Sequence, residues 1–400
     1  MAQRAQDRPK ASKVYFSDLR VSEGQTLLSK LRNLVIAAGI RDIDFERKFT
    51  AIKMHFGEGE NIAYLRPNWA KVIVDLVKEL GGRPFLVDCN TLYPGRRKNA
   101  LEHLELAYEH GFSPFSTGCN ILIGDGLTGS DEAVVPVHNG RHIKEAKVGR
   151  VVMDADILIS LNHFKGHVET GFGGALKNIG MGCGSRAGKM EMHSASHPKI
   201  LQEGCIGCAK CSKYCASDAI YYQARKAHIN AKLCISCGHC IAACPTDSIR
   251  PSFDETSELL DAKMVEYAKA ILDVLPAFHI SLALDISPLC DCWSSNDTPI
   301  VPDVGMFASF DPVALDLACA EAVNAQPPCR DSQLGEALAH LSRDAEHPAH
   351  THGAHSHSCA PDPAAIDYFD LINTSSHWRT QIDHGVMIGL GAGTYELITV

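Results

Sequence analysis

The segment ADILISLNHFKGH, residues 155–167, is an apolar run that ends in a polar loop. A run that is apolar almost throughout is typical of a strand buried on both faces of a sheet. Other segments share this composition, and most of them alternate with segments of helical periodicity. The expected strands are 49–56, 85–90, 120–126, 155–167, 279–288 and 300–310, and the expected helices are 24–39, 66–82, 99–111, 264–275 and 311–325. This alternation predicts an α/β fold with a mainly parallel sheet covered by helices.

Charge and the chain ends limit the classes of partner. The 400 residues carry a formal charge of −9 with a pI near 6.1, which disfavours duplex nucleic acid as a partner. No apolar run approaches the ~18 residues that a membrane span needs. Residues 1–13 are polar and basic, so we expect a disordered leader and no secretory signal. We expect residues 385–400 to form a glycine-linked pair of edge strands, and the protein to be cytoplasmic.

Sixteen cysteines without a secretory signal indicate metal binding rather than disulfides, because cytosolic thiols stay reduced. Eight of them form two copies of the motif C-x2-C-x2-C-x3-C. In bacterial two-cluster ferredoxins this motif holds [4Fe–4S] clusters, and the fourth cysteine of each copy binds the other cluster. The expected ligand sets are Cys205, Cys208, Cys211 and Cys244 for one cluster, and Cys234, Cys237, Cys240 and Cys215 for the second.

Zinc is the alternative metal for such a segment. A zinc ribbon uses paired CxxC motifs, which explain neither the third cysteine nor the fourth of each copy. Residues 204–251 resemble the bacterial two-cluster ferredoxins, although Ala216 stands where that family usually has proline. That change loosens a turn and removes no ligand. We therefore predict one α/β domain, residues 1–200 and 253–400, interrupted by a ferredoxin-like two-cluster insert over 201–252.

Polar residues follow several of the expected strands, at the edge where open parallel sheets bind ligands. The segment 162–193 is rich in glycine and lysine, and it matches neither the HExxH zinc motif nor a Walker loop. It is suited to holding an anionic group, with close packing by glycine as the alternative. We expect one pocket with His163, Lys165, His167 and Lys177 as catalytic residues, and Asp88, Asn90, Asp125, Asn162, Asn178, Gly173 and Gly174 as ligand-binding residues.

Two other groups have the chemistry of metal ligands. Residues 340–359 contain six histidines and Cys359 in a loop of low complexity. Neutral imidazoles bind Ni or Zn, so this loop is a candidate for capturing a transition metal, and an inert solvated loop is the alternative. Cys290 and Cys292 form a close pair that could bind metal, cycle as a dithiol, or simply be two buried thiols.

Four segments carry a family resemblance: NTLYPGRR (90–97), GDGLTGSDE (124–132), LNHFKGHVETGFGGALKNIGMG (161–182) and CDCWSSNDTPIVPDVGMFASFDPVALD (290–316). They resemble the iron–sulfur proteins called domain of unknown function 362, over about residues 49–324. The resemblance implies a core similar to the nickel-dependent lactate racemase group, in which histidines and a lysine surround a nickel-pincer nucleotide. No motif of that group matches here position by position, so no catalytic residue is carried over.

These observations favour a redox protein. We expect single electrons to pass through two [4Fe–4S] clusters, to or from an anionic small molecule or cofactor in the crevice, with a separate redox partner protein. The alternative is a noncatalytic electron carrier or a metal-handling accessory protein. The two hypotheses differ in whether a concave crevice lies close to a cluster.

Overall fold

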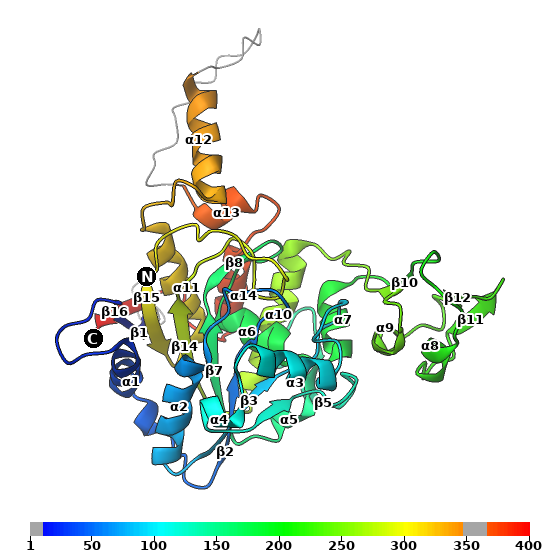
Figure 1. The fold of residues 1–400 in the computed structure, drawn as a ribbon, viewed down its shortest axis with the longest axis horizontal. Coiled ribbons are helices and arrows are strands. Elements are labelled where there is room, and N and C mark those ends of the chain that lie inside the picture. Colours follow the sequence, from blue (N-terminus) through cyan, green and yellow to red (C-terminus); the bar gives the residue numbers. More distant parts are fainter. Residues whose placement is uncertain (1–10, 347–365) are drawn as a thin grey trace, which may run out of the picture.

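A computed structural model describes residues 11–346 and 366–400, which are built around an eight-stranded sheet (Figure 1). The strand order is β16-β1-β15-β14-β7-β2-β3-β4. The strands are β1 Ser12–Ser17, β2 Phe49–Lys53, β3 Arg83–Asp88, β4 Ile121–Ile123, β7 Ile157–His163, β14 Ala277–Ala283, β15 Gly305–Ser309 and β16 Tyr395–Thr399. Five of the seven neighbouring pairs are parallel, and β15 is antiparallel to both of its neighbours. The predicted mainly parallel α/β fold is confirmed.

Helices cover both faces of the sheet (Figure 1). One face carries α1 Leu27–Ala37 and α2 Pro67–Glu79, and the other carries α6 Ala175–Cys183, α10 Ser257–Leu272, α11 Pro312–Asn324 and α14 Arg379–Met387. All seven residues of β7 are buried. Ile157, Ile159 and Leu161 pack with α1 and α2, whereas Leu158 packs on the opposite face, because successive strand residues alternate in direction.

Other elements complete the α/β body. They are η1 Ile40–Asp42, α3 Ala100–Glu109, α4 Pro114–Thr117, β5 Glu132–Pro136, β6 Glu145–Gly149, α5 Arg150–Met153, β8 Lys165–His167, β9 Gly171–Gly173, α7 Arg186–His193, α12 Gln333–Glu346 and α13 Tyr368–Ile372. Local signals explain the helix boundaries. Pro67 begins α2, and the Asp311 carboxylate accepts hydrogen bonds from the N–H groups of Val313 and Ala314 at the start of α11 (2.9 and 3.0 Å). No helix of the described residues is long and apolar enough to cross a membrane.

Both chain ends differ from the sequence prediction. Ser12 and Lys13 belong to β1, which pairs with β15 and β16, so the leader boundary at residue 13 was wrong; residues 1–10 lie outside the described residues. The predicted pair of edge strands over 385–400 was also wrong. Residues 385–387 end α14, and only β16 is a strand. Ile382 is buried on the core side of α14, and Gly389 adopts φ +76° beyond its end, so one glycine ends a helix rather than linking two strands.

The predicted histidine-rich loop begins in a helix. His340 lies in α12, where Leu334 and Leu338 face the core at a helical spacing of four residues, so the loop prediction was wrong for residues 340–346. The side chain of Ser332 accepts a hydrogen bond from the N–H of Gly335, which satisfies one free donor of the first turn. The other five histidines and Cys359 lie outside the described residues.

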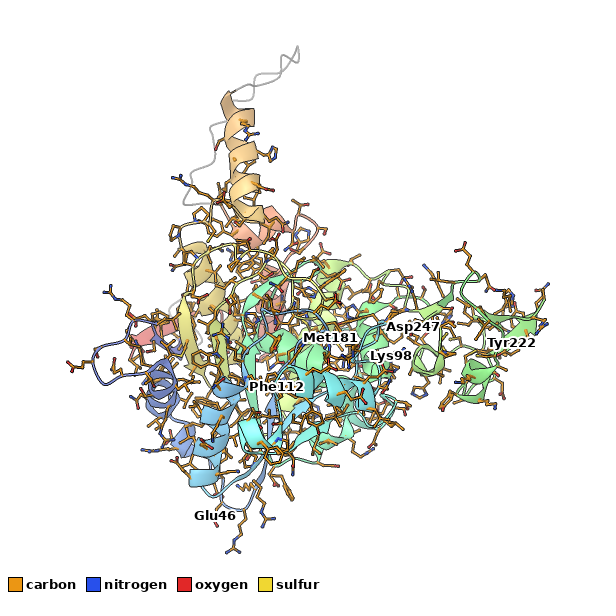
Figure 2. All side chains as sticks on the ribbon, viewed as in Figure 1. Glu46, Lys98, Phe112, Met181, Tyr222 and Asp247 are labelled. Carbon is orange, nitrogen blue, oxygen red and sulfur yellow. The ribbon has the colours of Figure 1, made fainter. Side chains whose placement is uncertain are left out.

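The cysteine-rich segment extends away from the sheet (Figure 1). Its elements are β10 Lys199–Ile200, α8 Lys210–Lys213, β11 Ile220–Gln223, β12 Lys226–Ile229, α9 His239–Ala243 and β13 Ile249–Arg250. The antiparallel pair β10–β13 brings the two ends of the segment together. Lys98 of the body and Asp247 of the segment form an ion pair at 3.0 Å, and Figure 2 shows them side by side at the junction, with Tyr222 at the far end.

Candidate functional site

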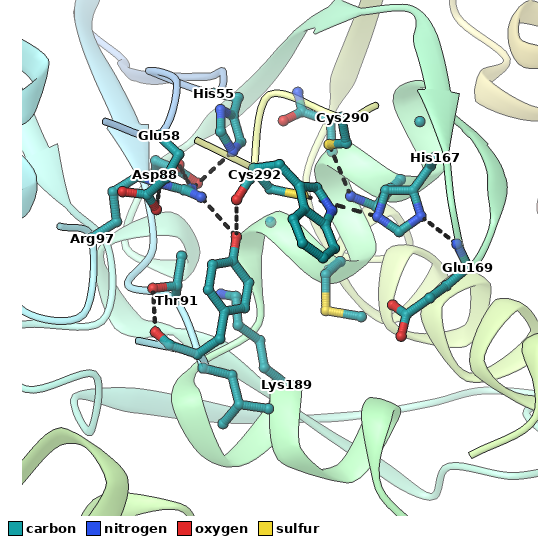
Figure 3. A pocket seen from close by; sticks show the side chains of 18 of the residues that line it. His55, Glu58, Asp88, Thr91, Arg97, His167, Glu169, Lys189, Cys290 and Cys292 are labelled. Atoms are coloured by element: carbon teal, nitrogen blue, oxygen red, sulfur yellow. Dashed lines mark hydrogen bonds and ion pairs between the residues drawn. The ribbon is translucent and has the colours of Figure 1, made fainter. Parts of the chain in front are cut away.

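A cavity of about 490 Å³ lies at the carboxyl ends of β2, β3 and β7 (Figure 3). Its walls come from the loops after these strands, the β8–β9 hairpin, α6, α7 and the segment after β14. Eight of the eleven predicted pocket residues line it: Asp88, His163, Lys165, His167, Gly173, Gly174, Lys177 and Asn178. The structure thus brings most of the predicted set together.

The other three predicted residues lie behind the cavity wall. Asn90 donates its side-chain amide to Asp125 at 2.8 Å, and both side chains are fully buried. Burial raises the pKa of Asp125 to about 6. The side chain of Asn178 donates to Asn162 at 2.7 Å, so Asn162 supports a cavity residue without lining the cavity itself. These three residues hold the strand ends in place.

The glycine-rich start of α6 does not offer free N–H groups to a ligand. The Asp316 carboxylate accepts hydrogen bonds from the N–H groups of Ala175 and Leu176, at 2.7 and 2.9 Å. A Cβ on Gly174 would lie 2.3 Å from Asp316 Oδ1, so glycine is required there for this close approach. Gly173 and Gly174 line the cavity, but the N–H groups of the two residues that follow them are taken by a carboxylate of the protein.

Lys53, which was not among the predicted site residues, contacts two of them, Asp88 and Asn178. Its ammonium lies 2.9 Å from Asp88 Oδ1 and donates to Asn178 Oδ1 at 2.8 Å. The side chains of Lys53 and Asp88 are only 1% and 3% exposed. Burial opposes ionisation of Asp88, but Lys53 and His103 outweigh it and hold the pKa of Asp88 well below its usual range. This pair is therefore a buried ion pair at the end of β2 and β3.

Arg97 organises a second part of the wall. Its guanidinium donates to Glu58 at 3.0 Å and to the Tyr93 hydroxyl at 2.7 Å, and one of its nitrogens lies 2.8 Å from His55 Nε2. Burial and the neighbouring guanidinium lower the pKa of His55 well below its usual range. His55 is therefore a neutral ring, and its Nδ1 accepts the N–H of Gly57 at 2.9 Å.

His163 is held on both sides of its ring. Its Nδ1 lies 2.8 Å from Asp291 Oδ1, and its Nε2 lies 2.6 Å from the carbonyl oxygen of Leu284. Both partners are acceptors, so both ring nitrogens act as donors and neither is free to take a proton. Burial opposes ionisation of Asp291, but His163 and Lys165 hold its pKa well below the usual range. His163 therefore lines the cavity with both ring nitrogens held by buried acceptors.

His167, Cys290 and Cys292 form a second polar group in the wall (Figure 3). The His167 nitrogen and the two sulfur atoms all lie within 4.8 Å of one another. Lys177 Nζ lies 3.5 Å from Cys290 Sγ, and His167 Nε2 lies 4.0 Å from Cys292 Sγ. The two thiols and the ammonium thus form one connected cluster.

The cavity carries excess positive charge. Its cationic side chains are Lys53, Lys165, Lys177, Lys189 and Arg97, and its carboxylates are Glu58, Asp88 and Glu169. Two of these carboxylates, Asp88 and Glu58, already form ion pairs with Lys53 and Arg97. Within the part of the chain that the structure describes, neither Lys177 nor Lys189 has a carboxylate within 4.0 Å. Such an arrangement favours an anionic ligand.

The eight cysteines of the doubled motif line two small cavities in the extended segment. One is lined by Cys205, Cys208, Cys211 and Cys244, and the other by Cys215, Cys234, Cys237 and Cys240. Backbone N–H groups donate to three of these sulfurs, those of Cys205, Cys215 and Cys244, at 3.4, 3.2 and 3.3 Å. None of the fifteen described cysteines forms a disulfide.

A contact connects the two regions. Leu92 lines the large cavity and also packs in a buried group with Cys211, Cys240 and Cys244. A Cβ on Gly238, between Cys237 and Cys240, would lie 3.5 Å from Leu92 Cδ1. Leu92 therefore lies between the large cavity and Gly238, which lines the cavity of Cys215, Cys234, Cys237 and Cys240.

Another group of possible metal ligands is His142, Glu266 and His384. Glu266 accepts hydrogen bonds from the N–H groups of residues 141, 142 and 143, and it lies 2.9 Å from His384 Nε2. Its oxygens are already satisfied, so this group has a structural role in holding the β5–β6 turn.

Several wall residues were missed because their positions in the sequence carry no pattern. Lys53 lies inside the expected strand 49–56 and not at its end, and the one signal for Arg97 was its place in the segment 90–97 that carries the family resemblance. Cys290 and Cys292 were noticed as a pair, but their place in the crevice was not predicted.

The chain matches one protein family and several solved structures, among them the following two. A search of curated proteins finds no match. The lactate racemase apoprotein from Thermoanaerobacterium thermosaccharolyticum is similar with a TM-score of 0.33 and 11% identity, over 68% of this chain and 51% of that one. A structural-genomics target from Thermotoga maritima is similar with a TM-score of 0.34 and 14% identity, over 64% and 49%. The chain spans about half the length of each.

The segments that form the cavity wall fall within a single family match. That match covers residues 50–321, from the second residue of β2 to the C-terminal part of α11. Because it spans more than half of the chain, the protein belongs to the family described as Domain of unknown function (DUF362).

Proposed function

We propose that the protein binds two [4Fe–4S] clusters in the segment 201–252 and exchanges single electrons with an anionic small molecule or cofactor held in the large cavity. One observation carries this proposal: the segment holds two cavities lined by four cysteines each, and one of them adjoins the cationic cavity through the contact between Leu92 and Gly238. Bound clusters supply one-electron chemistry. A separate redox partner protein would exchange electrons at the exposed side of the segment.

The donor set fits this cofactor. Each small cavity takes three cysteines from one copy of the motif and its fourth from the other copy, the exchange that two-cluster ferredoxins use. N–H groups directed at Cys205, Cys215 and Cys244 suit sulfurs that carry negative charge. A tetrathiolate zinc site is the competing assignment, and metal analysis distinguishes the two.

A short path supports electron passage into the cavity. Leu92 contacts the loop of Cys237 and Cys240 on one side. The next residue, Tyr93, donates its hydroxyl to the carbonyl oxygen of Cys292 at 3.1 Å. From the cysteine loop to Cys292, the path therefore consists of the apolar contact of Leu92, the peptide bond from Leu92 to Tyr93 and the hydrogen bond from the Tyr93 hydroxyl.

The cavity has the properties of an anion site with apolar walls. Lys177 and Lys189 supply charge that no carboxylate within 4.0 Å neutralises in the described structure. Leu92, Met181 and Trp293 add apolar surface for the rest of the ligand. A volume of about 490 Å³ is within the ~300–1,000 Å³ that small-molecule sites occupy.

The test begins with protein purified without oxygen. Iron and sulfide analysis, with mass spectrometry of co-purified small molecules, measures the cofactor and the ligand in one preparation. Anion binding is followed with pyrophosphate as the probe, through the fluorescence of Trp293, which is 51% exposed whereas Trp69 and Trp378 are buried. Lys177→Gln should weaken pyrophosphate binding about tenfold, and Lys71→Gln on the surface of α2 should not change it.

The results of these measurements distinguish a redox enzyme from a noncatalytic electron carrier. Iron and sulfide without any anion binding would favour a noncatalytic electron carrier. Zinc in place of iron would overturn the cluster assignment and favour a metal-handling accessory protein.

A further inference from the structure

Cys290, Asp291 and Cys292 form a tight turn in the cavity wall. The N–H of Trp293 donates to the carbonyl oxygen of Cys290 at 3.0 Å, which closes the turn. Both cysteines line the cavity, and their sulfur atoms lie within 4.8 Å of each other. Residues two apart in a turn have Cα atoms about 5–6 Å apart, a separation that a disulfide can span. The two cysteines are therefore close enough to be joined by a disulfide.

The surroundings of the two sulfurs differ. Lys177 Nζ lies 3.5 Å from Cys290 Sγ, and Lys165, whose Nζ lies 3.6 Å from Asp291 Oδ2, also lines the cavity. A hydrogen bond from the Cys292 thiol, aided by both lysines, outweighs burial and lowers the pKa of Cys290 well below its usual range. The same hydrogen bond and burial raise the pKa of Cys292. Cys290 is thus a thiolate that faces the cavity, and Cys292 is the thiol beside it.

A metal ion fits this group poorly. His167 Nδ1 accepts the N–H groups of Glu169 and Thr170, at 3.2 and 3.1 Å. The proton of the neutral ring is therefore on Nε2, the nitrogen that faces Cys292, so no lone pair points at the sulfurs. The ammonium groups of Lys177 and Lys165 would also repel a dication there. The cluster has the composition of a thiol redox site.

We propose that Cys290 and Cys292 are a redox-active dithiol that reduces an anionic disulfide bound in the cavity. The Cys290 thiolate attacks one sulfur of R–S–S–R, the substrate S–S bond breaks, and RS⁻ leaves and takes the proton of Cys292. The Cys292 thiolate then attacks Cys290 Sγ, which releases the second RS⁻ and forms the Cys290–Cys292 disulfide. Lys177 and Lys165 bind the carboxylates of the substrate and stabilise the thiolate.

The return step rests on the function proposed above. The Cys290–Cys292 disulfide accepts two electrons, one from each reduced cluster, and one proton, which restores the thiolate and the thiol. The Tyr93 hydroxyl, 3.1 Å from the Cys292 carbonyl oxygen, places this disulfide at the end of the path through Leu92. The pair would thereby convert two single-electron steps into one two-electron reaction.

The first experiment treats anaerobic holoprotein with oxidised glutathione and maps the peptides by mass. Wild type should lose two hydrogens across Cys290 and Cys292. Cys292→Ser should instead retain one glutathionyl group on Cys290, and Cys290→Ser should react at least tenfold more slowly. Unmodified thiols in the wild type, or a stoichiometric metal ion that protects the pair, would overturn the proposal.

A second measurement tests the proposal without the serine variants, in case these fail to fold. Alkylation of Cys290 by iodoacetamide should be nearly constant from pH 6 to 8 in wild type and should shift to higher pH in Lys177→Gln. Buried Cys119, whose pKa is raised by burial, is the internal control and should react only at higher pH. A Cys290 profile that matches that of Cys119 would refute the assigned thiolate.

A final measurement distinguishes the dithiol proposal from the proposed electron transfer into the cavity. Photoreduction of the clusters should reopen the oxidised pair in holoprotein but not in protein stripped of iron. If glutathione closes the pair and photoreduction fails to reopen it, the dithiol stands and the proposed electron transfer into the cavity is refuted.

Discussion

Lys53→Met should destabilise the protein far more than its single charge suggests. Lys53 and Asp88 form an ion pair at 2.9 Å with side chains 1% and 3% exposed. Removing one partner of a buried pair costs about 3–5 kcal/mol, because the other charge stays buried. Asp88 keeps the N–H of Cys89 at 2.9 Å and His103 at 3.6 Å. We therefore expect the lower end of that range, about 3 kcal/mol.

The pH dependence should change sign in the variant. In wild type the pKa of Asp88 is well below its usual range, so the stabilisation from its charge is complete at pH 7 and is lost only as the pH falls below about 4. Without Lys53, burial becomes the dominant influence and raises the pKa of Asp88. The folded variant then takes up a proton that the unfolded chain does not, and its deficit should shrink between pH 7 and pH 5.

The assay is urea unfolding followed by circular dichroism at pH 7 and pH 5 without oxygen. Lys71→Met is the matched control, because Lys71 and Asp75 are also 2.8 Å apart but 48% and 44% exposed. That substitution should cost less than about 1 kcal/mol at both pH values. Equal losses in the two variants, or a Lys53→Met deficit that grows on acidification, would refute the reasoning from burial.

Three further predictions concern the insert and the histidine-rich segment. Anaerobic protein should hold about eight iron and eight sulfide per chain, and Cys215→Ser should lower both; a preparation with four iron that tolerates Cys215→Ser would mean that one cluster assembles. Deleting residues 201–251 with a short linker should leave a folded α/β body, because β10 and β13 bring the two ends together; an unfolded circular dichroism spectrum would place the insert in the core. Alanine at His350, His352, His355 and His357 should lower Ni(II) or Zn(II) uptake without changing the iron–sulfur absorbance, and unchanged uptake would exclude this loop as the metal site.

The crevice shows how many site residues can be predicted from their positions at the ends of strands. Eight of the eleven expected residues line one cavity, because the carboxyl ends of parallel strands meet at one edge of a sheet. Asn90, Asp125 and Asn162 belong to the same edge but turn into the packing behind it. Position along a strand predicts the edge, whereas the direction of each side chain depends on partners from other segments.

Short-range pattern was sufficient for the parallel sheet and for the grouping of the cysteines. Continuous apolar strands and amphipathic helices specify which surfaces must be buried, and the two cysteine sets expected from spacing line two separate cavities. Only the tertiary structure decided the chemistry of the crevice. Lys177 and Cys290 are 113 residues apart, and Lys53 and Asn178 are 125 apart, yet each pair is in contact. The charge and proton position of these groups depend on burial and on partners distant in the chain, which no local pattern of residues contains.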